Sequence, residues 1–244
     1  MREVKSAVIL AAGMGTRLIG VTNNLIPKGF LQIENKSLIE RSIEKLRSVG
    51  IEKIYIATGH LCEFYEDLAK KNDFIIVEKN AEFANTGSMA SLAIFKSLIN
   101  EDFLLLESDL IYEKRALVEA MNYEGKDCIL VSGKTNSGDE VYIEVKNGGL
   151  YSASKDRSTV KELFGEWVGI SKISKELFFK MVEKNQESAI AQYHYEDALV
   201  DVSKDYIVKC NKIEDLIWAE IDDESHLKRV ENEIVPKLRI KNEI

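Results

Sequence analysis

The first half of the chain alternates short apolar runs with amphipathic stretches. The apolar runs predict four strands, at residues 7–12, 54–57, 74–77 and 103–106. The amphipathic stretches carry apolar residues at helical spacing and predict three helices, at residues 38–49, 64–71 and 88–99. Repeated strand–helix–strand units favour a parallel sheet. We therefore expect an α/β fold in which helices cover both faces of a mostly parallel sheet.

The second half of the chain is less regular. Apolar and polar side chains alternate over residues 141–145, and Asn147-Gly148-Gly149 follows, which predicts a strand leading into a turn. Other patterns predict strands at 167–170 and 217–221, a helix at 174–183, and a closing helix from the acidic residues 222–224 through 235. Because no break in composition divides the chain, we expect one domain over residues 1–244 with inserted substrate-binding strands.

Composition and charge narrow the class of protein. No apolar run approaches the ~18 residues that a membrane-spanning helix needs, and the first apolar segment is too short for a signal peptide. Three widely spaced cysteines (Cys62, Cys128 and Cys210) argue against disulfides and a zinc site, so we expect a cytoplasmic protein. The net charge of −8 disfavours nucleic acid and anionic membranes as partners. A bound anion must therefore be held by a few local cations and backbone donors.

A small-residue loop follows the first predicted strand. Its sequence is Leu10-Ala11-Ala12-Gly13-Met14-Gly15-Thr16-Arg17-Leu18, and Pro27-Lys28 comes ten residues later. The N–H groups of such a loop can bind phosphate oxygens, and Arg17 and Lys28 add two cations. A dinucleotide fingerprint and a P-loop are excluded, because Leu18 replaces the third glycine and no Gly-Lys-Ser/Thr follows. A plain glycine turn is the alternative, but the combination favours phosphate binding.

These motifs resemble the signature of sugar-phosphate nucleotidylyltransferases and their cytidylyltransferase relatives. Asp109 and Asp222 match that family's two metal-binding aspartates, and Thr86-Gly87-Ser88 matches its nucleobase loop. The likeness is greatest to phosphocholine and 2-aminoethylphosphonate cytidylyltransferases. It implies a Rossmann-like three-layer fold with a mixed central sheet, in which residues 1–130 mainly bind the nucleotide and residues 131–244 mainly bind the acceptor.

The resemblance also implies roles for individual residues. Arg17 and Lys28 would be catalytic, and Asp109 and Asp222 would hold Mg²⁺, which prefers oxygen ligands. The implied nucleotide-binding residues are Leu10, Ala11, Ala12, Gly13, Gly15, Thr16, Arg17, Lys28, Gly59, Thr86, Gly87 and Ser88.

Each aspartate also has an ordinary structural explanation. Asp109 suits a turn and Asp222 suits a helix N-cap, although Asp223 could take the capping role and leave Asp222 free. Their joint position at strand ends, where open α/β sheets bind ligands, favours the metal site. The wider acidic run 220–224 lacks the spacing of an EF-hand loop, so we do not expect calcium.

Acidic residues mark the expected acceptor region. Candidates for binding an acceptor ammonium are Asp139, Glu140, Glu196 and Asp197, and Lys155 is a candidate for its phosphonate. Val141 stands where an aromatic cage around a quaternary ammonium would be expected, which favours 2-aminoethylphosphonate. Trp167 and Tyr195 could still supply a cage wall for phosphocholine. Sugar 1-phosphates and a nucleotide-sensing domain without turnover are further alternatives, and a homo-oligomer is left open.

Overall fold

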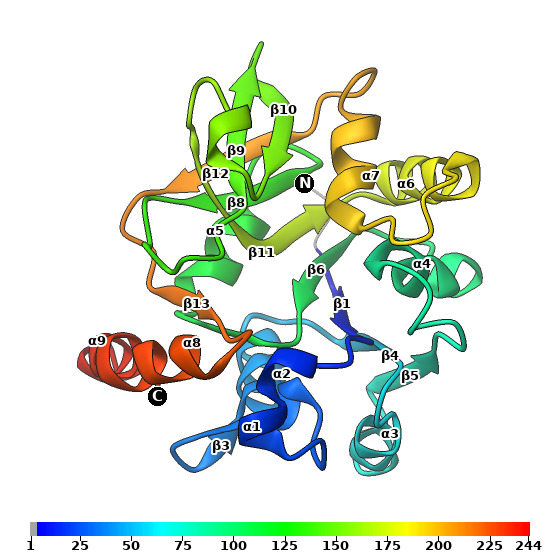
Figure 1. Cartoon of the computed structure of the whole chain (residues 1–244). Helices are drawn as coiled ribbons and strands as arrows, with labels where there is room; N and C mark the ends of the chain where they lie inside the picture. Colours follow the sequence, from blue (N-terminus) through cyan, green and yellow to red (C-terminus); the bar gives the residue numbers. More distant parts are fainter. Residues whose placement is uncertain (1–3) are drawn as a thin grey trace.

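The centre of the protein is a nine-stranded mixed sheet, seen in a computed structural model that describes residues 4–244 (Figure 1). Its parallel part has the spatial order β6, β1, β4, β5, with bounds Phe103–Glu107, Ser6–Ala11, Lys53–Thr58 and Ile75–Lys79. These are the four strands predicted from the apolar runs. The chain passes from β1 outward to β4 and β5 and then returns to β6 on the other side of β1, so the strand order reverses between β1 and β6.

Two helical layers cover the parallel strands. Side chains alternate along β1, so Val8 and Leu10 belong to one apolar core while Ala7 and Ile9 belong to the other. The first core contains side chains from α4 (Ser88–Ala93), α6 (Lys175–Glu187) and α7 (Tyr195–Val202). The second contains side chains from α2 (Leu38–Ser48), α3 (Glu63–Lys70) and α5 (Arg115–Asn122). The predicted Rossmann-like three-layer fold is confirmed.

The limits of the helices follow local chemistry. Ser37 and Glu40 form a reciprocal capping box at the start of α2, and Gly50 follows its end with φ of +92°. The single helix expected over 88–99 is instead α4 followed by a 3₁₀ turn, Ile94–Ser97. A tighter last turn is common because it pairs carbonyls that the α-helix would leave free, and here Phe95 O accepts from the N–H groups of Leu98 and Ile99.

Strands of the second half extend the sheet beyond β6. β11 (Gly165–Ile173) runs antiparallel to β6 and also pairs with β8 (Cys128–Ser132) and β9 (Tyr142–Lys146). β12 (Lys209–Ile213) lies parallel to β8. The predicted turn after residue 145 joins β9 to β10 (Gly149–Ser154), with positive φ at Asn147 and Gly148. The sheet is therefore mixed, as expected.

The last predicted strand lies outside the main sheet. β13 (Trp218–Glu220) pairs with β7 (Leu110–Tyr112) as an antiparallel two-stranded ribbon. β7 directly follows β6 along the chain, and β13 directly precedes the closing helix. Their pairing therefore brings the two halves of the chain together beside the carboxyl end of β6. No pattern within residues 217–221 identifies this partner, because strand pairing is set by the tertiary fold.

The closing helix is longer than predicted. α8 (Glu224–Arg229) starts at Asp223, whose carboxylate accepts the N–H of His226 at 2.9 Å. A π-helical turn and α9 (Val235–Ile240) continue it past residue 235, since Val235 and Leu238 are buried in a third apolar core. Other short elements are α1 (Ile19–Thr22), β2 (Gln32–Ile33), β3 (Lys36–Ser37) and the 3₁₀ turns Thr16–Leu18, Lys28–Phe30 and Arg157–Thr159. Within residues 4–244, no helix has the length and apolar character needed to cross a membrane.

Candidate functional site

A cleft of about 440 Å³ opens at the carboxyl ends of β1 and β6, where the strand order reverses. Ligands of open α/β sheets bind at this kind of position. The cleft brings together the glycine loop, the loop before α4, the turn after β6 and the start of α7. Of the residues predicted to bind nucleotide, those that line the cleft are Leu10, Ala11, Ala12, Gly13, Gly15, Thr16, Lys28, Thr86, Gly87 and Ser88.

The glycine loop has the backbone that close ligand approach requires. Gly15 adopts φ of +62°, a left-handed conformation that side chains disfavour, and a Cβ there would lie 3.1 Å from Lys28 Cγ. Gly13 has open space on its Cβ side. The loop therefore leaves room for a ligand at Gly13 and packs closely on the Lys28 stem at Gly15.

Two other predicted glycines have different surroundings. A side chain at Gly87 would overlap the backbone carbonyl of Tyr193, so the loop before α4 is pressed against the segment before α7. Gly59 does not line the cleft, and a Cβ there would lie 2.6 Å from the Ala12 carbonyl oxygen. The lack of a side chain at Gly59 thus lets its backbone pack closely against Ala12 of the glycine loop.

The predicted catalytic cations and metal-binding aspartates form one network. Lys28 Nζ lies 3.0 Å from Asp109 Oδ2 and also donates to Asp222 Oδ1, while Arg17 Nη2 lies 2.6 Å from Asp222 Oδ2. The side chains of Lys28, Asp109 and Asp222 are 17%, 13% and 4% exposed. The two aspartates, 113 residues apart in sequence, therefore reach the same cation.

Burial and charge act in opposite directions on these groups. Burial alone would lower the pKa of Lys28, but Asp109 and Asp222 outweigh it and raise that pKa above its usual value. Burial alone would raise the pKa of Asp222, but Lys28 and the other donors hold it well below its usual range. The ammonium and the carboxylate are both charged at neutral pH as a result.

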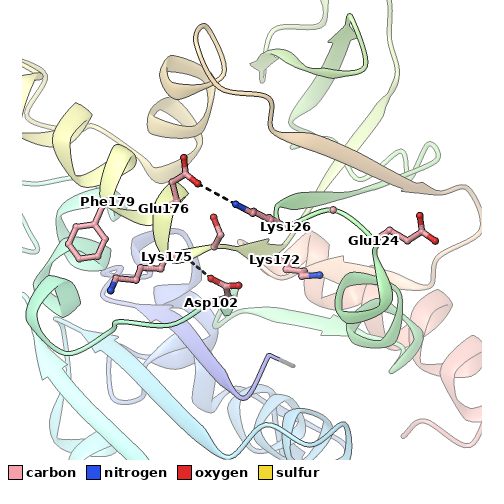
Figure 2. A pocket seen from close by; sticks show the side chains of 9 residues that line it. Asp102, Glu124, Lys126, Lys172, Lys175, Glu176 and Phe179 are labelled. Atoms are coloured by element: carbon pink, nitrogen blue, oxygen red, sulfur yellow. Dashed lines mark hydrogen bonds and ion pairs between the residues drawn. The ribbon is translucent and has the colours of Figure 1, made fainter. Parts of the chain in front are cut away.

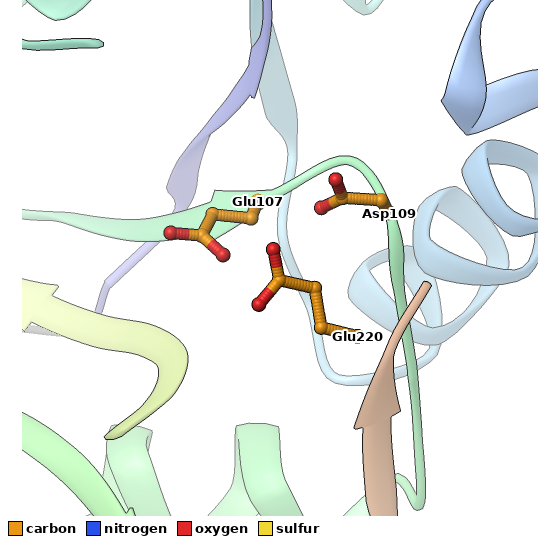
Figure 3. Close-up of side chains that lie close together, drawn as sticks. All are labelled: Glu107, Asp109 and Glu220. Atoms are coloured by element: carbon orange, nitrogen blue, oxygen red, sulfur yellow. The ribbon is translucent and has the colours of Figure 1, made fainter. Parts of the chain in front are cut away.

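Two further carboxylates lie beside Asp109. Figure 3 shows Glu107, Asp109 and Glu220 pointing toward one another, each with a carboxylate oxygen within 4.8 Å of the others. Burial and the neighbouring acids raise the pKa of Glu107 and of Glu220. Sequence reasoning missed both residues. Each stands two positions before a predicted metal ligand, a spacing that places side chains on one face of an extended segment.

Oxygen ligands of this kind fit a hard divalent cation. The structure itself supplies a test of the fit, because the Lys28 ammonium already lies within bonding distance of Asp109 and is bonded to Asp222. Both carboxylates therefore converge on one positive charge without any rearrangement of the backbone.

The predicted acceptor residues separate into two groups. Asp139 accepts from Arg17 Nη1 and from Lys155 Nζ, each at 2.9 Å, and so joins the acceptor region to the nucleotide region. Glu140 accepts from the N–H of Gly138 at 3.1 Å and stabilises the turn beside Asp139. Asp197 caps α7 by accepting the N–H of His194 at 2.9 Å and does not line the cleft.

Glu196 and Tyr195 line the cleft, and Trp167 packs against Tyr195. The Glu196 Oε2 atom is buried and has no hydrogen-bond partner among residues 4–244, and burial raises the pKa of this carboxyl to about 7. Tyr195 donates to Glu107 Oε1 at 2.6 Å and packs edge-to-face on Trp167 at 5.9 Å between ring centroids.

A small cavity of about 20 Å³ lies beside Trp167. It is lined by Asp139, Trp167, Trp218 and Glu220, among others, and Glu220 also lines the main cleft. The indole N–H groups of Trp167 and Trp218 are buried and find no acceptor within the described part of the chain. The space is large enough for one water molecule.

A larger cavity, of about 650 Å³, lies at the opposite end of β6 (Figure 2). Its charged side chains are largely paired with each other or with the backbone. Lys126 lies 3.6 Å from Glu176, and Asp102 accepts the backbone N–H of Lys175 at 2.9 Å. None of the predicted site residues lines it, so the cleft beside the glycine loop is the candidate site despite its smaller volume.

Comparison with known proteins shows the family of this chain. The family model described as "Nucleotidyl transferase" matches residues 6–142, more than half of the chain. The bifunctional protein GlmU of Methanococcus vannielii is 41% identical over 123 residues, which cover 48% of this chain and 27% of that protein. This chain thus spans only part of the length of that relative.

Two other relatives cover more of the chain. The choline-phosphate cytidylyltransferase of Streptococcus pneumoniae is 30% identical over 155 residues, covering 60% of this chain and 67% of that protein. The CMP-5'-(3-aminopropyl)phosphonate synthase of Streptomyces rubellomurinus is 21% identical over 234 residues, covering 89% of this chain and 37% of that protein. Among solved structures, the inositol-1-phosphate CTP transferase from T. maritima has a TM-score of 0.83 at 20% identity, with coverage of 98% and 96%, which shows a shared fold.

Proposed function

This chain belongs to the nucleotidyl transferase family, as its motifs predict, and we propose that it is a Mg²⁺-dependent cytidylyltransferase acting on 2-aminoethylphosphonate. It would transfer CMP from CTP to the phosphonate and release pyrophosphate. The observation that carries the proposal is the single network of Arg17, Lys28, Asp109 and Asp222 beside the glycine loop. This network brings together cations for a triphosphate and carboxylates for a metal ion at the cleft, which Lys28 and Asp109 line.

The chemistry needs positioning and charge compensation rather than a protein nucleophile. A phosphonate oxygen of the acceptor attacks the α-phosphorus of CTP, and the bond from that phosphorus to the pyrophosphate oxygen breaks. Both reactants are anions, so their repulsion and alignment dominate the barrier. Arg17, Lys28 and the loop amides would bind the triphosphate, with Lys28 nearest the α-phosphate. A divalent ion held by Asp109 and Asp222 would neutralise charge on the reacting oxygens.

The acceptor side supports a zwitterionic substrate. Lys155 and Asp139 form an ion pair at 2.9 Å in a half-exposed position. An acceptor with both charges could replace this pair, because its phosphonate would bind Lys155 and its ammonium would bind Asp139. A sugar 1-phosphate brings no cation and would leave Asp139 with one partner fewer. Glu196 Oε2, which has no hydrogen-bond partner among the described residues, offers a second acceptor for an ammonium N–H.

The named relatives add support of the same kind. The Streptomyces protein is named for an aminoalkylphosphonate product, which is the chemical class proposed here. In this proposal residues 1–130 mainly bind CTP, and residues 131–244 supply Asp139, Lys155 and Glu196 for the acceptor together with Asp222 for the metal. A cytoplasmic location remains a prediction.

Phosphocholine is the second candidate acceptor, and one observation favours it. Trp167 and Tyr195 form an edge-to-face pair beside the cleft, and aromatic faces bind quaternary ammonium groups. A quaternary ammonium has no N–H to donate, however, so it would leave the buried oxygen of Glu196 without a partner.

A small panel of substrates tests the proposal. Each of four nucleoside triphosphates is incubated with 2-aminoethylphosphonate, phosphocholine or glucose 1-phosphate, with Mg²⁺, and pyrophosphate release is measured. We expect the highest kcat/KM with CTP and 2-aminoethylphosphonate. Equal or better use of phosphocholine would replace the acceptor, and preference for a sugar phosphate would refute the zwitterion argument. Nucleotide binding without pyrophosphate release under any condition would identify a sensor instead.

A further inference from the structure

The position proposed for the metal ion contains a cation of the protein itself. Lys28 Nζ lies 3.0 Å from Asp109 Oδ2 and donates to Asp222 Oδ1. The second oxygen of Asp222 is paired with Arg17 at 2.6 Å. Both oxygens of Asp222, whose side chain is 4% exposed, therefore have a cationic partner before any ligand binds.

We propose that Lys28 is a placeholder for the divalent ion, which keeps free metal off Asp109 and Asp222 until a nucleotide draws the ammonium away. The inference rests on the proposed metal site. It adds that this site is not open in the nucleotide-free protein, although all its ligands are in place. Metal and nucleotide would then bind together, and neither would bind well alone.

The reason is competition between charges at short range. A divalent ion approaching Asp109 and Asp222 meets the ammonium of Lys28 in the same space, and like charges at a few ångströms repel strongly in a partly buried cleft. A triphosphate changes the balance because its oxygens are strong acceptors for Lys28 and Arg17. When Lys28 and Arg17 bind phosphate oxygens instead, the carboxylates of Asp109 and Asp222 lose these cationic partners and are free to bind a divalent ion. Each ligand thus raises the affinity for the other, and the coupling is reciprocal.

The fold holds Lys28 in a position from which it can reach either partner. Its stem packs against the glycine loop, since a Cβ at Gly15 would lie 3.1 Å from Lys28 Cγ. Pro27 precedes it with extended backbone, and the short 3₁₀ turn Lys28–Phe30 follows. The ammonium lies on a flexible four-carbon stem beside the loop that would bind phosphate, so a change of partner needs only side-chain rotation.

The test measures metal binding in the absence of turnover. Mn²⁺ binding to the nucleotide-free protein, residues 1–244, is followed by electron paramagnetic resonance for wild type and for Lys28→Met, which keeps the stem and removes the charge. We expect Lys28→Met to bind Mn²⁺ about 5- to 150-fold more tightly, the range typical of coupled sites. A non-hydrolysable CTP analogue should tighten Mn²⁺ binding to wild type and should have a much smaller effect in Lys28→Met.

Two controls make the result decisive. Lys155→Met removes a nearby cation that pairs with Asp139 rather than with Asp109 or Asp222, and it should change Mn²⁺ affinity by less than about fivefold, the lower end of the range for coupled sites. Adding Asp222→Asn to Lys28→Met should abolish the gain. Circular dichroism confirms folding, and Lys28→Gln replaces Lys28→Met if the latter does not fold. Equal Mn²⁺ affinities of wild type and a folded Lys28 variant would overturn the proposed role of Lys28.

No acceptor and no turnover enter this measurement. A chain that binds Mn²⁺ as expected but fails to release pyrophosphate would therefore refute the proposed reaction while supporting the role of Lys28. If wild type releases pyrophosphate but the Lys28 variants bind Mn²⁺ no more tightly than wild type, the proposed reaction is supported and the proposed role of Lys28 is refuted.

Discussion

Neutralising Asp139 is the sharpest test of how the acceptor is recognised. This carboxylate pairs with Arg17 and Lys155, whose side chains are 52% and 58% exposed, while Asp139 itself is 20% exposed. Ion pairs as exposed as these contribute about 0.2–1 kcal/mol each. Asp139→Asn should therefore reduce the free energy of unfolding by less than about 2 kcal/mol and leave the protein folded.

The effect on catalysis should be larger and selective. A hydrogen bond to a charged group is worth about 1.5–3 kcal/mol, so losing the bond from an acceptor ammonium should lower kcat/KM about 10- to 150-fold. Ethylphosphonate has no amine and cannot make this bond. With that acceptor, Asp139→Asn should change kcat/KM by less than about threefold, or increase it as Lys155 loses its competing partner.

The assay is pyrophosphate release with CTP and each acceptor, for wild type, Asp139→Asn and Asp156→Asn. Asp156 carries the same charge one residue from Lys155, but it caps the short turn that follows by accepting the N–H of Ser158 at 2.9 Å. This control should behave as wild type with both acceptors. Equal losses with 2-aminoethylphosphonate and ethylphosphonate in Asp139→Asn would refute the reasoning, because they would show a general effect on the cleft rather than recognition of the amine.

Other predictions test the remaining parts of the site and fold. Asp109→Ala and Asp222→Ala should each abolish pyrophosphate release while circular dichroism stays that of wild type; retained Mg²⁺-dependent turnover in both would contradict the metal site. Chelation by EDTA should stop wild-type turnover, and added Mg²⁺ should restore it. Gly87→Ala should lower the melting temperature, since its Cβ would overlap the Tyr193 carbonyl; a cost of about 1–3 kcal/mol is expected, and an unchanged melting temperature would disprove the close contact. Burial raises the pKa of Glu166, so the native protein keeps the Glu166 proton at a pH at which the unfolded chain has already lost it. The free energy of unfolding therefore falls as the pH rises from the ordinary pKa of a glutamate toward the raised pKa of Glu166. Between pH 4 and pH 7, the free energy of unfolding measured in urea titrations should therefore fall less for Glu166→Gln than for wild type. The same pH dependence in both proteins would contradict a raised pKa of Glu166.

Local patterns in the sequence were sufficient for most of the elements. The apolar runs identified the four parallel strands because a strand buried between two helical layers needs apolar residues on both faces. The helix predicted over 38–49 corresponds closely to α2, because its limits depend on residues next to the helix, and Gly50 follows its end with a positive φ. Asp223 could be named as a cap for the same reason, and that left Asp222 available for the cleft.

The limits of the elements were less predictable where distant packing decides them. The closing helix continues past residue 235 because Val235 and Leu238 are buried against a core formed by other segments. β13 pairs with β7 rather than with the main sheet, and the two strands are separated by more than 100 residues. No local pattern records such a partner, because pairing depends on which segments the rest of the fold brings together.

The sequence by itself determined the class of fold, the glycine loop, and the residue types able to hold phosphate and a divalent ion. The tertiary structure alone decided how these groups are paired. It brought Glu107 and Glu220 beside Asp109 and placed the Lys28 ammonium between two aspartates. It also left one oxygen of Glu196 without a hydrogen-bond partner in the part of the chain that the structure describes. The physical reason is that charge pairing and burial depend on distances between segments far apart in the chain, whereas secondary structure and loop chemistry depend on neighbouring residues.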